Sequence, residues 1–210
     1  MSLDVWVSFV TLTLIAVLSP GPAVLLAITH GSQFGMRRAV FPILGNITGL
    51  AILMSLTVIG VGTILEASSQ WFFWLRIAGG LYLVYLGIRL LRSAQTSLGD
   101  QINQVEQLVT VPSRRKSYLQ GVGVALSNPK ALLFIGALFP QFVDIAHPVW
   151  TQLMILGVTL MAMSFCGLLL WAAFSRALIA RGRQALYGKI NKITGSLFIA
   201  FGIALAAGSR

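Results

Sequence analysis

Apolar residues gather into six long runs that short polar segments separate. The runs cover 5–29, 39–63, 71–91, 118–142, 149–174 and 190–207. A run of about 20 apolar residues is the length that an α-helix needs to cross a hydrocarbon core roughly 30 Å thick. The pattern therefore predicts an all-α polytopic membrane protein, with six transmembrane helices in a single domain that spans residues 1–210.

Composition supports this fold class. Of the 210 residues, 57% are hydrophobic and only 10% are charged, whereas soluble domains carry about 25% charged residues. The chain has too few polar side chains to cover a surface that faces water on all sides. A soluble protein with a buried all-helical core remains the alternative.

The net charge of +10 comes from residues in short loops. No basic stripe with interleaved aromatic residues is present, and we expect no nucleic-acid partner. Cytoplasmic loops of membrane proteins are rich in lysine and arginine, so the orientation predicted for an inner-membrane protein places both termini outside. The basic residues at the ends of the first, third and fifth runs and in the loops after them are Arg37, Arg38, Arg89, Arg92, Arg114, Arg115, Lys116, Arg176, Arg181, Arg183, Lys189 and Lys192.

Two of the runs contain helix-breaking residues at matching places. The segment LSPGPAVLLA at 18–27 resembles LSNPKALLFI at 126–135, with a proline inside each apolar run. The likeness continues in the same order, as ILGNIT resembles ILGVT and RIAGGLYLVY resembles KITGSLFIAF. Three matches in order predict two three-helix repeats, at about 1–92 and 118–210, with a cytoplasmic loop at about 93–117.

Because each repeat holds an odd number of spans, the second must cross the membrane inverted relative to the first. In secondary transporters built this way, paired broken helices mark a binding site near the bilayer midplane. We therefore expect helices one and four to be broken at Pro20–Pro22 and Pro129. Backbone groups that proline leaves unpaired are tolerated in the membrane where they line a polar cavity.

Lys130 is the most informative residue of the predicted site, because it lies deep in the fourth run. A lysine at that depth is costly unless it meets water, a partner or a ligand. All five acidic residues lie near or outside the ends of the runs, so we expect Lys130 to be available for a substrate carboxylate. The N–H groups of the helix after Pro22 could share that anion. Snorkelling of the side chain is the alternative.

Other polar residues near the breaks complete the prediction. A substrate ammonium could be bound by amide, hydroxyl and carbonyl oxygens, although Asn46 could instead bond across a helix interface. The predicted substrate-binding residues are Ser19, Pro20, Gly21, Pro22, Asn46, Ser127, Asn128, Pro129 and Lys130. With one cysteine and two histidines near run ends, we expect no metal site and no cofactor. The sequence does not determine the oligomeric state, and a homodimer is one of the states it allows.

The segments LSPGPAVLLAI, GLYLVYLGIRLLR and NPKALLFIGALFPQF together resemble the LysE/RhtB family of bacterial amino-acid exporters over nearly the whole chain. The motif ALFPQF at 137–142 is most similar to the branch that exports homoserine, threonine and related neutral amino acids. The resemblance implies efflux of small amino acids from the cytoplasm, driven by the proton gradient. It supplies no coupling residue, since we find no carboxylate inside the predicted membrane region.

The resulting hypothesis is a secondary transporter in the bacterial inner membrane that works by alternating access and is not an enzyme. The alternatives are a channel-like pore for ions or small solutes and a non-transporting membrane scaffold. A membrane-embedded enzyme would need a nucleophile with a base, or a metal site, and His30 and His147 have no catalytic spacing.

Overall fold

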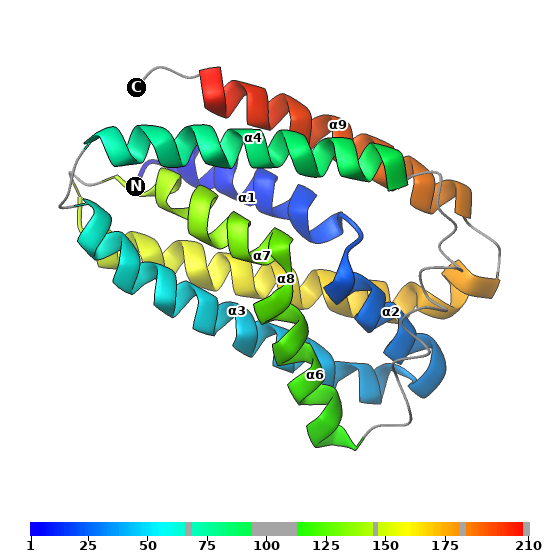
Figure 1. Ribbon diagram of the computed structural model, residues 1–210. Helices are drawn as coiled ribbons and strands as arrows, with labels where there is room; N and C mark the ends of the chain where they lie inside the picture. The colour runs from blue at the N-terminus through cyan, green and yellow to red at the C-terminus, as the bar shows by residue number, and fades with distance from the viewer. Residues whose placement is uncertain (66–68, 94–112, 145–146, 181–183, 208–210) are drawn as a thin grey trace.

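The computed structural model describes residues 1–65, 69–93, 113–144, 147–180 and 184–207, which form helices and no strand (Figure 1). One helix or pair of helices lies at each of the six predicted runs. The elements are α1 (Leu3–Leu18), α2 (Pro22–Phe34), α3 (Met36–Leu65), α4 (Ser69–Ser93), α6 (Arg114–Ser127), α7 (Pro129–Leu133), the π-helical turn η1 (Phe134–Leu138), the 3-10 turn η2 (Phe139–Phe142), α8 (Val149–Ala180) and α9 (Gln184–Ala207).

Several helices extend beyond the predicted runs at their basic ends. α6 begins at Arg114 because the hydroxyl of Ser113 caps it, accepting a hydrogen bond from the N–H of Lys116 at 3.3 Å. Charged residues can continue a helix past the apolar stretch, so an apolar run marks the membrane segment rather than the helix end. Most of the predicted loop at 93–117 lies outside the described residues.

Within the described residues, three helical stretches are long and apolar enough to cross a membrane: Met36–Thr57, Val149–Ser175 and Gly188–Ala207. Two bent pairs meet the same criterion if each pair is one span, which raises the number to five. Large apolar side chains on the outside are more than half exposed, including Leu56, Trp150 and Ile193. Such a surface is suited to lipid rather than to water.

The first predicted break is present between α1 and α2, whose axes meet at 54°. α1 ends at Leu18, and Ser19 and Gly21 both adopt extended backbone conformations. Each of these residues precedes a proline, which disfavours the helical conformation of the residue before it. Pro22 then opens α2 at the first helical position, where its missing N–H costs nothing.

The second predicted break is present between α6 and α7, at 53°. Asn128 precedes Pro129 and is extended, with φ −76° and ψ 108°. Its side chain caps the new helix, because Oδ1 accepts a hydrogen bond from the N–H of Lys130 at 3.0 Å. Both breaks therefore follow from the local chemistry of proline and the residue before it.

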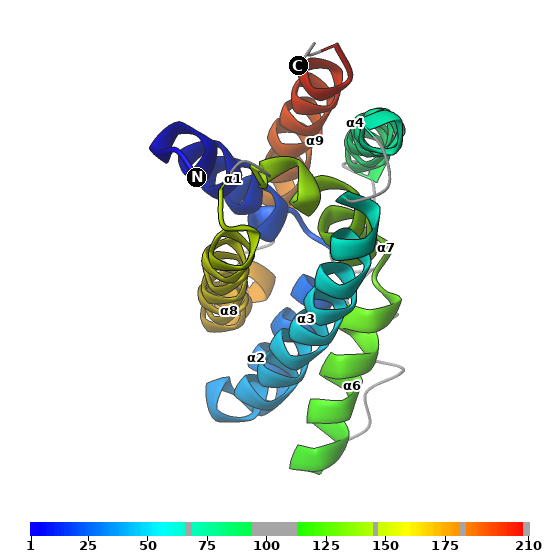
Figure 2. The same ribbon diagram turned by 90° about the vertical axis from the view of Figure 1, so that its left-hand side faces the viewer.

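α4 lies against α9 in an antiparallel pair that both views show side by side (Figures 1 and 2). Glycines allow the close approach. A methyl group at Gly80 would lie 2.7 Å from the carbonyl oxygen of Gly202, and one at Gly87 would lie 2.5 Å from that of Gly195. These four glycines fix where the two helices cross, since larger residues would force them apart.

α3 packs along α6, and the two helices run in the same direction (Figure 2). Gly45 faces the backbone at Tyr118, and Gly49 faces Ala125 further along both helices. The hydroxyl of Tyr118 donates to Thr48 Oγ1 at 2.8 Å. α2 meets α8 in a similar way, because Gly31 lies against the backbone of Ala172.

Two apolar cores fill the bundle. The larger one joins α1, α3, α4, α8, α9 and the turns after α7, and its centre includes Phe9, Phe139 and Phe198, each at most 1% exposed. The smaller core joins α2, α3 and α8 around Ile28. At the two breaks, Ser19, Pro20 and Asn128 are buried, whereas Pro22 and Pro129 are exposed.

Candidate functional site

A cavity of about 70 Å³ lies where the two breaks meet. Residues of α1, α2, α3, α8 and the segment from Asn128 onward line it, and most of them are apolar. Its polar side chains are Asn46, Asn128, Lys130 and Ser164. A single water molecule needs roughly 10–15 Å³, so the cavity has room for a small polar molecule or several waters.

The ammonium of Lys130 reaches across the first break to the end of α1. It donates to the carbonyl oxygens of Ala16 at 2.9 Å and Ser19 at 3.0 Å, and to the hydroxyl of Ser19 at 2.9 Å. A lysine ammonium has three N–H donors, and all three are used. The negative end of the α1 dipole thus stabilises this charge, and among the described residues no carboxylate takes part.

Ser19 is fully buried and completes the same cluster. Its hydroxyl donates to the carbonyl oxygen of Ala16 at 3.0 Å while it accepts from Lys130. Gly21 lies beside the lysine as well, because a methyl group there would be 3.4 Å from Nζ. The structure thus brings together Ser19, Gly21 and Lys130, three of the predicted substrate-binding residues, and of these Lys130 lines the cavity.

The first turn of α2 lies at the cavity, and its N–H groups have no side-chain cap. Its N-cap, Gly21, has no side chain to accept from them. Ala23 and Val24 line the cavity, and their N–H groups have no backbone partner within the described part of the chain. Unpaired N–H groups at a helix N-terminus, next to the positive charge of Lys130, favour an anion.

Asn46 of α3 and Ser164 of α8 supply neutral polar groups. Their exposures are 5% and 7%, and both line the cavity. Neither side chain has a hydrogen-bond partner among the residues that the structure describes. Buried polar groups are normally paired, so two unpaired ones that line the same cavity are suited to a polar ligand.

The remaining predicted residues have other positions. Ser127 is exposed, and its hydroxyl donates to the carbonyl oxygen of Gly123 at 2.8 Å instead of lining the cavity. Pro22 and Pro129 are exposed and Pro20 is buried. These prolines shape the breaks without contributing side chains to the cavity lining.

Ser164 is the polar cavity residue that the sequence did not predict. It lies in an uninterrupted apolar helix, and no break or neighbouring charge marks it. Its one signal is its spacing, because Leu160 and Leu168, four residues on either side, line the same cavity. Residues four apart share a face of an α-helix.

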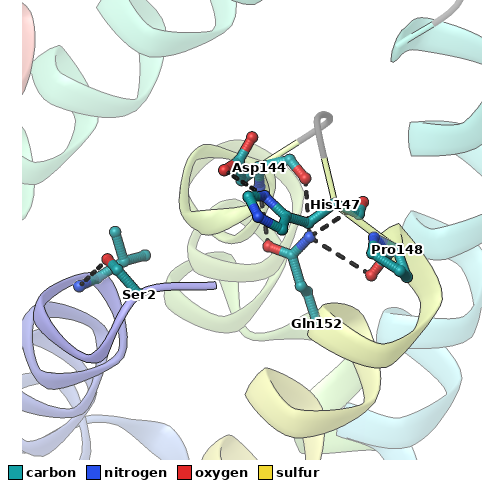
Figure 3. Close-up of polar contacts among 6 residues, drawn as sticks. Ser2, Asp144, His147, Pro148 and Gln152 are labelled. Atoms are coloured by element: carbon teal, nitrogen blue, oxygen red, sulfur yellow. Dashed lines mark hydrogen bonds and ion pairs between the residues drawn. The ribbon is translucent and has the colours of Figure 1, made fainter.

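The two histidines lie away from the cavity. His30 is fully buried on α2, with Nδ1 3.1 Å from the carbonyl oxygen of Leu26. Figure 3 shows His147 before α8, with Nδ1 2.9 Å from Asp144 Oδ2, and Gln152 donating to the carbonyl oxygens of Asp144 and Pro148. This cluster ties the start of α8 to the preceding segment. In the described part of the chain, no group of three or more His, Cys, Asp or Glu side chains could hold a metal.

The broken helices and their shared cavity are typical of transporters, and comparison with known proteins supports that assignment. The LysE type translocator family matches residues 14–209. The chain belongs to this family. The predicted all-α class and the predicted broad function, amino-acid efflux, are therefore confirmed, whereas the six spans in two inverted repeats stay a prediction.

Individual relatives match over nearly the full length. The homoserine/homoserine lactone efflux protein of Salmonella typhimurium is 32% identical over 209 residues, which are 99% of this chain and 98% of the relative. The leucine efflux protein of Salmonella choleraesuis is 33% identical over 195 residues, 90% of this chain and 89% of the relative. An uncharacterized membrane protein of Vibrio cholerae is 30% identical over 98% of both chains. No solved structure matches this chain.

Proposed function

We propose that this LysE type translocator exports small neutral amino acids across the bacterial inner membrane by alternating access. The observation that carries the proposal is the meeting of two broken helices at one cavity. The cavity offers free N–H donors at one helix end and unpaired neutral polar side chains on α3 and α8. A zwitterion needs both kinds of partner.

We further propose that six spans form two inverted repeats of three. The antiparallel pairing of α4 with α9 and the parallel pairing of α3 with α6 support this, because both directions follow if each run crosses the membrane once. The start of α1 and the end of α9 are at the same end of the bundle (Figure 1). By the distribution of basic loop residues, that end faces outward.

The proposed pose puts the substrate carboxylate at the N–H groups of Ala23 and Val24. Lys130 contributes its positive charge from nearby, because its own three donors are used by α1. The substrate ammonium donates to Asn46 and Ser164. A small side chain meets the apolar lining, which suits homoserine, threonine or leucine, and the names of the relatives include two of these.

Export against a gradient requires an energy source, and we propose proton antiport. Among the residues that line the cavity, Lys130 is the one with an ionisable side chain. A proton exchanged at the substrate site would therefore use the Lys130 ammonium. This assignment needs no carboxylate inside the membrane.

Efflux from cells tests the function directly. Cells that overproduce the protein are loaded with dipeptides, which are hydrolysed inside, and each amino acid is followed outside. Efflux of a few small neutral amino acids should rise and should saturate with internal concentration. An uncoupler should slow it.

Three results decide between the alternatives. Saturable efflux that is insensitive to the uncoupler would support the exporter and reject proton antiport. Efflux that never saturates and shows no counter-exchange would favour a channel. Absence of efflux across the full panel of amino acids, from correctly inserted protein, would overturn the proposed function.

A further inference from the structure

The three oxygen atoms around the Lys130 ammonium form a site that resembles a cation site. They are the Ala16 carbonyl, the Ser19 carbonyl and the Ser19 hydroxyl, at 2.9–3.0 Å from Nζ. All three come from the last turn of α1 and the residue that follows it. Unwound carbonyls and the C-terminal ends of half-helices are the groups that bind coupling cations in transporters with discontinuous helices.

We propose that Lys130 is a tethered internal cation, which fills a monovalent-cation site at the end of α1 and thereby latches α1 to α7. The protein then carries in its own chain the cation that other broken-helix transporters take from solution. The role of this latch in the transport cycle rests on the proposed function, whereas the cation site at the end of α1 does not.

The latch joins the two halves of the molecule. Ser19 and Lys130 are 111 residues apart. α1 packs on α8 and α9, whereas α7 contacts α4 and η1. Separation of α1 from α7 must break three charge-assisted hydrogen bonds. None of the other described residues that line the cavity, on α1, α2, α3, η1 or α8, is ionisable. In the described part of the chain, these oxygens and the helix dipole therefore hold the charge.

Substitution of Lys130 by alanine tests the site without reference to transport. It removes Cγ, Cδ, Cε and Nζ, which together correspond to n-propylammonium, and leaves the oxygens behind. Thermal unfolding of the purified protein in detergent, followed by tryptophan fluorescence, should show a lower Tm for Lys130→Ala. Added n-propylammonium should raise that Tm by several degrees, because a ligand that binds only the folded state stabilises it by mass action.

Lys130→Met is the matched control, since methionine fills the same space with no N–H donor. Its Tm should also fall, but n-propylammonium should leave it unchanged, as it should leave the wild type. Tetramethylammonium, a cation without N–H donors, should not stabilise Lys130→Ala. An equal response of the alanine and methionine variants would overturn the proposal.

The acceptor side gives an independent test. In the Lys130→Ala protein, Ser19→Ala removes one of the three oxygens and should weaken n-propylammonium binding about tenfold or more, as expected for a hydrogen bond to a charged group. Ser127→Ala is the control, because Ser127 holds the corresponding place in the second break but bonds to its own helix. Equal binding by the two double variants would contradict the assigned site.

A second variant covers the case in which Lys130→Ala does not fold. The chain has one cysteine, Cys166, which is exposed. In a Cys166→Ala background, Lys130→Cys treated with 2-bromoethylamine gains a side chain of lysine length that ends in an ammonium. Alkylation should restore the Tm, whereas alkylation with iodoacetamide should not. Equal Tm values after both reagents would overturn the latch.

Transport is measured last, as counterflow in proteoliposomes at equal pH, because amines dissipate pH gradients. n-Propylammonium on both sides should restore counterflow to Lys130→Ala but not to Lys130→Met. A wild-type protein that carries no amino acid, together with amine stabilisation of Lys130→Ala, would reject the proposed function and keep the latch. If n-propylammonium does not stabilise Lys130→Ala while the wild type shows normal counterflow, the latch would be rejected and the proposed function kept.

Discussion

The contact between α3 and α6 leads to a prediction with a built-in control. A methyl group at Gly121 would overlap the carbonyl oxygen of Pro42, and would lie 2.8 Å from the Pro42 carbonyl carbon and 2.9 Å from the backbone nitrogen of Asn46. All three are backbone atoms, which cannot move without the helix. A methyl group at Gly123, two residues along the same helix, would have no heavy atom within 4 Å.

The structure sets the size of the two effects. Gly121→Ala must push α6 from α3 by roughly 1 Å, and overpacking of this kind costs about 1–3 kcal/mol. Replacing glycine inside a helix recovers roughly 0.5–1 kcal/mol of that. Gly123→Ala should show only this stabilising gain of roughly 0.5–1 kcal/mol, because its methyl group meets no other atom. Because both variants share that gain, their free energies of unfolding should differ by the overpacking cost, about 1–3 kcal/mol, which corresponds to about 2–12 °C in Tm for a chain of this size.

Thermal unfolding of the two variants in the same detergent is the assay, with amino-acid counterflow as a second measurement. Gly121→Ala should also reduce transport by more than its loss of folded protein explains. The reason is that the displaced backbone of α3 bears Asn46, which lines the cavity. Gly123→Ala should transport normally. Equal Tm values for the two variants would refute the close packing of α3 on α6 and the position of Asn46 derived from it.

Three further predictions concern the cavity and the topology. Ser164→Ala should raise the KM for the exported amino acid roughly 2- to 10-fold, as for one lost hydrogen bond, whereas Ser127→Ala, outside the cavity, should not; equal KM values would remove Ser164 from the site. Asn46→Ala should raise KM roughly 10- to 100-fold if it binds the substrate ammonium, and an unchanged KM would assign Asn46 to helix packing. In a cysteine-free background, Gly99→Cys and Ser69→Cys should be labelled from the cytoplasmic and outer sides respectively, and labelling of both from outside in intact cells would contradict the orientation.

The helix breaks could be predicted from sequence because their causes are local. Proline removes a donor and restricts the residue before it, wherever the segment lies in the fold. Ser19, Gly21 and Asn128 take the extended conformations that their following prolines favour. The same local chemistry says nothing of which groups meet across the breaks.

The partner of Lys130 could not be predicted in that way. From the absence of a nearby acidic residue, the sequence suggested a lysine left free for a mobile anion. Its partners are two backbone oxygens and one hydroxyl, 111 and 114 residues away, and the break itself exposes the backbone oxygens. A broken helix exposes carbonyl groups at one end as well as N–H groups at the other, and only the tertiary contact decides which end a lysine reaches.

The two breaks are also unequal, because their N-cap residues differ. At the second break Asn128 caps α7 with its own side chain, so the N–H of Lys130 is already paired. At the first break Gly21 has no side chain to cap α2, and Ala23 and Val24 of its first turn line the cavity. One open helix N-terminus in a cavity of this size accounts for one carboxylate, which is why the proposed pose places the substrate at α2.

This inequality can be tested by giving α2 a cap of its own. Gly21 is extended, a conformation that any residue adopts, and serine at an N-cap accepts from the N–H groups two and three residues on. Gly21→Ser should therefore raise Tm and raise the KM for the exported amino acid, because the new hydroxyl competes with the carboxylate for Ala23 and Val24. Gly21→Ala adds the Cβ without the oxygen and should raise KM less. If serine and alanine change KM equally, the effect is steric, and the carboxylate does not bind at the start of α2.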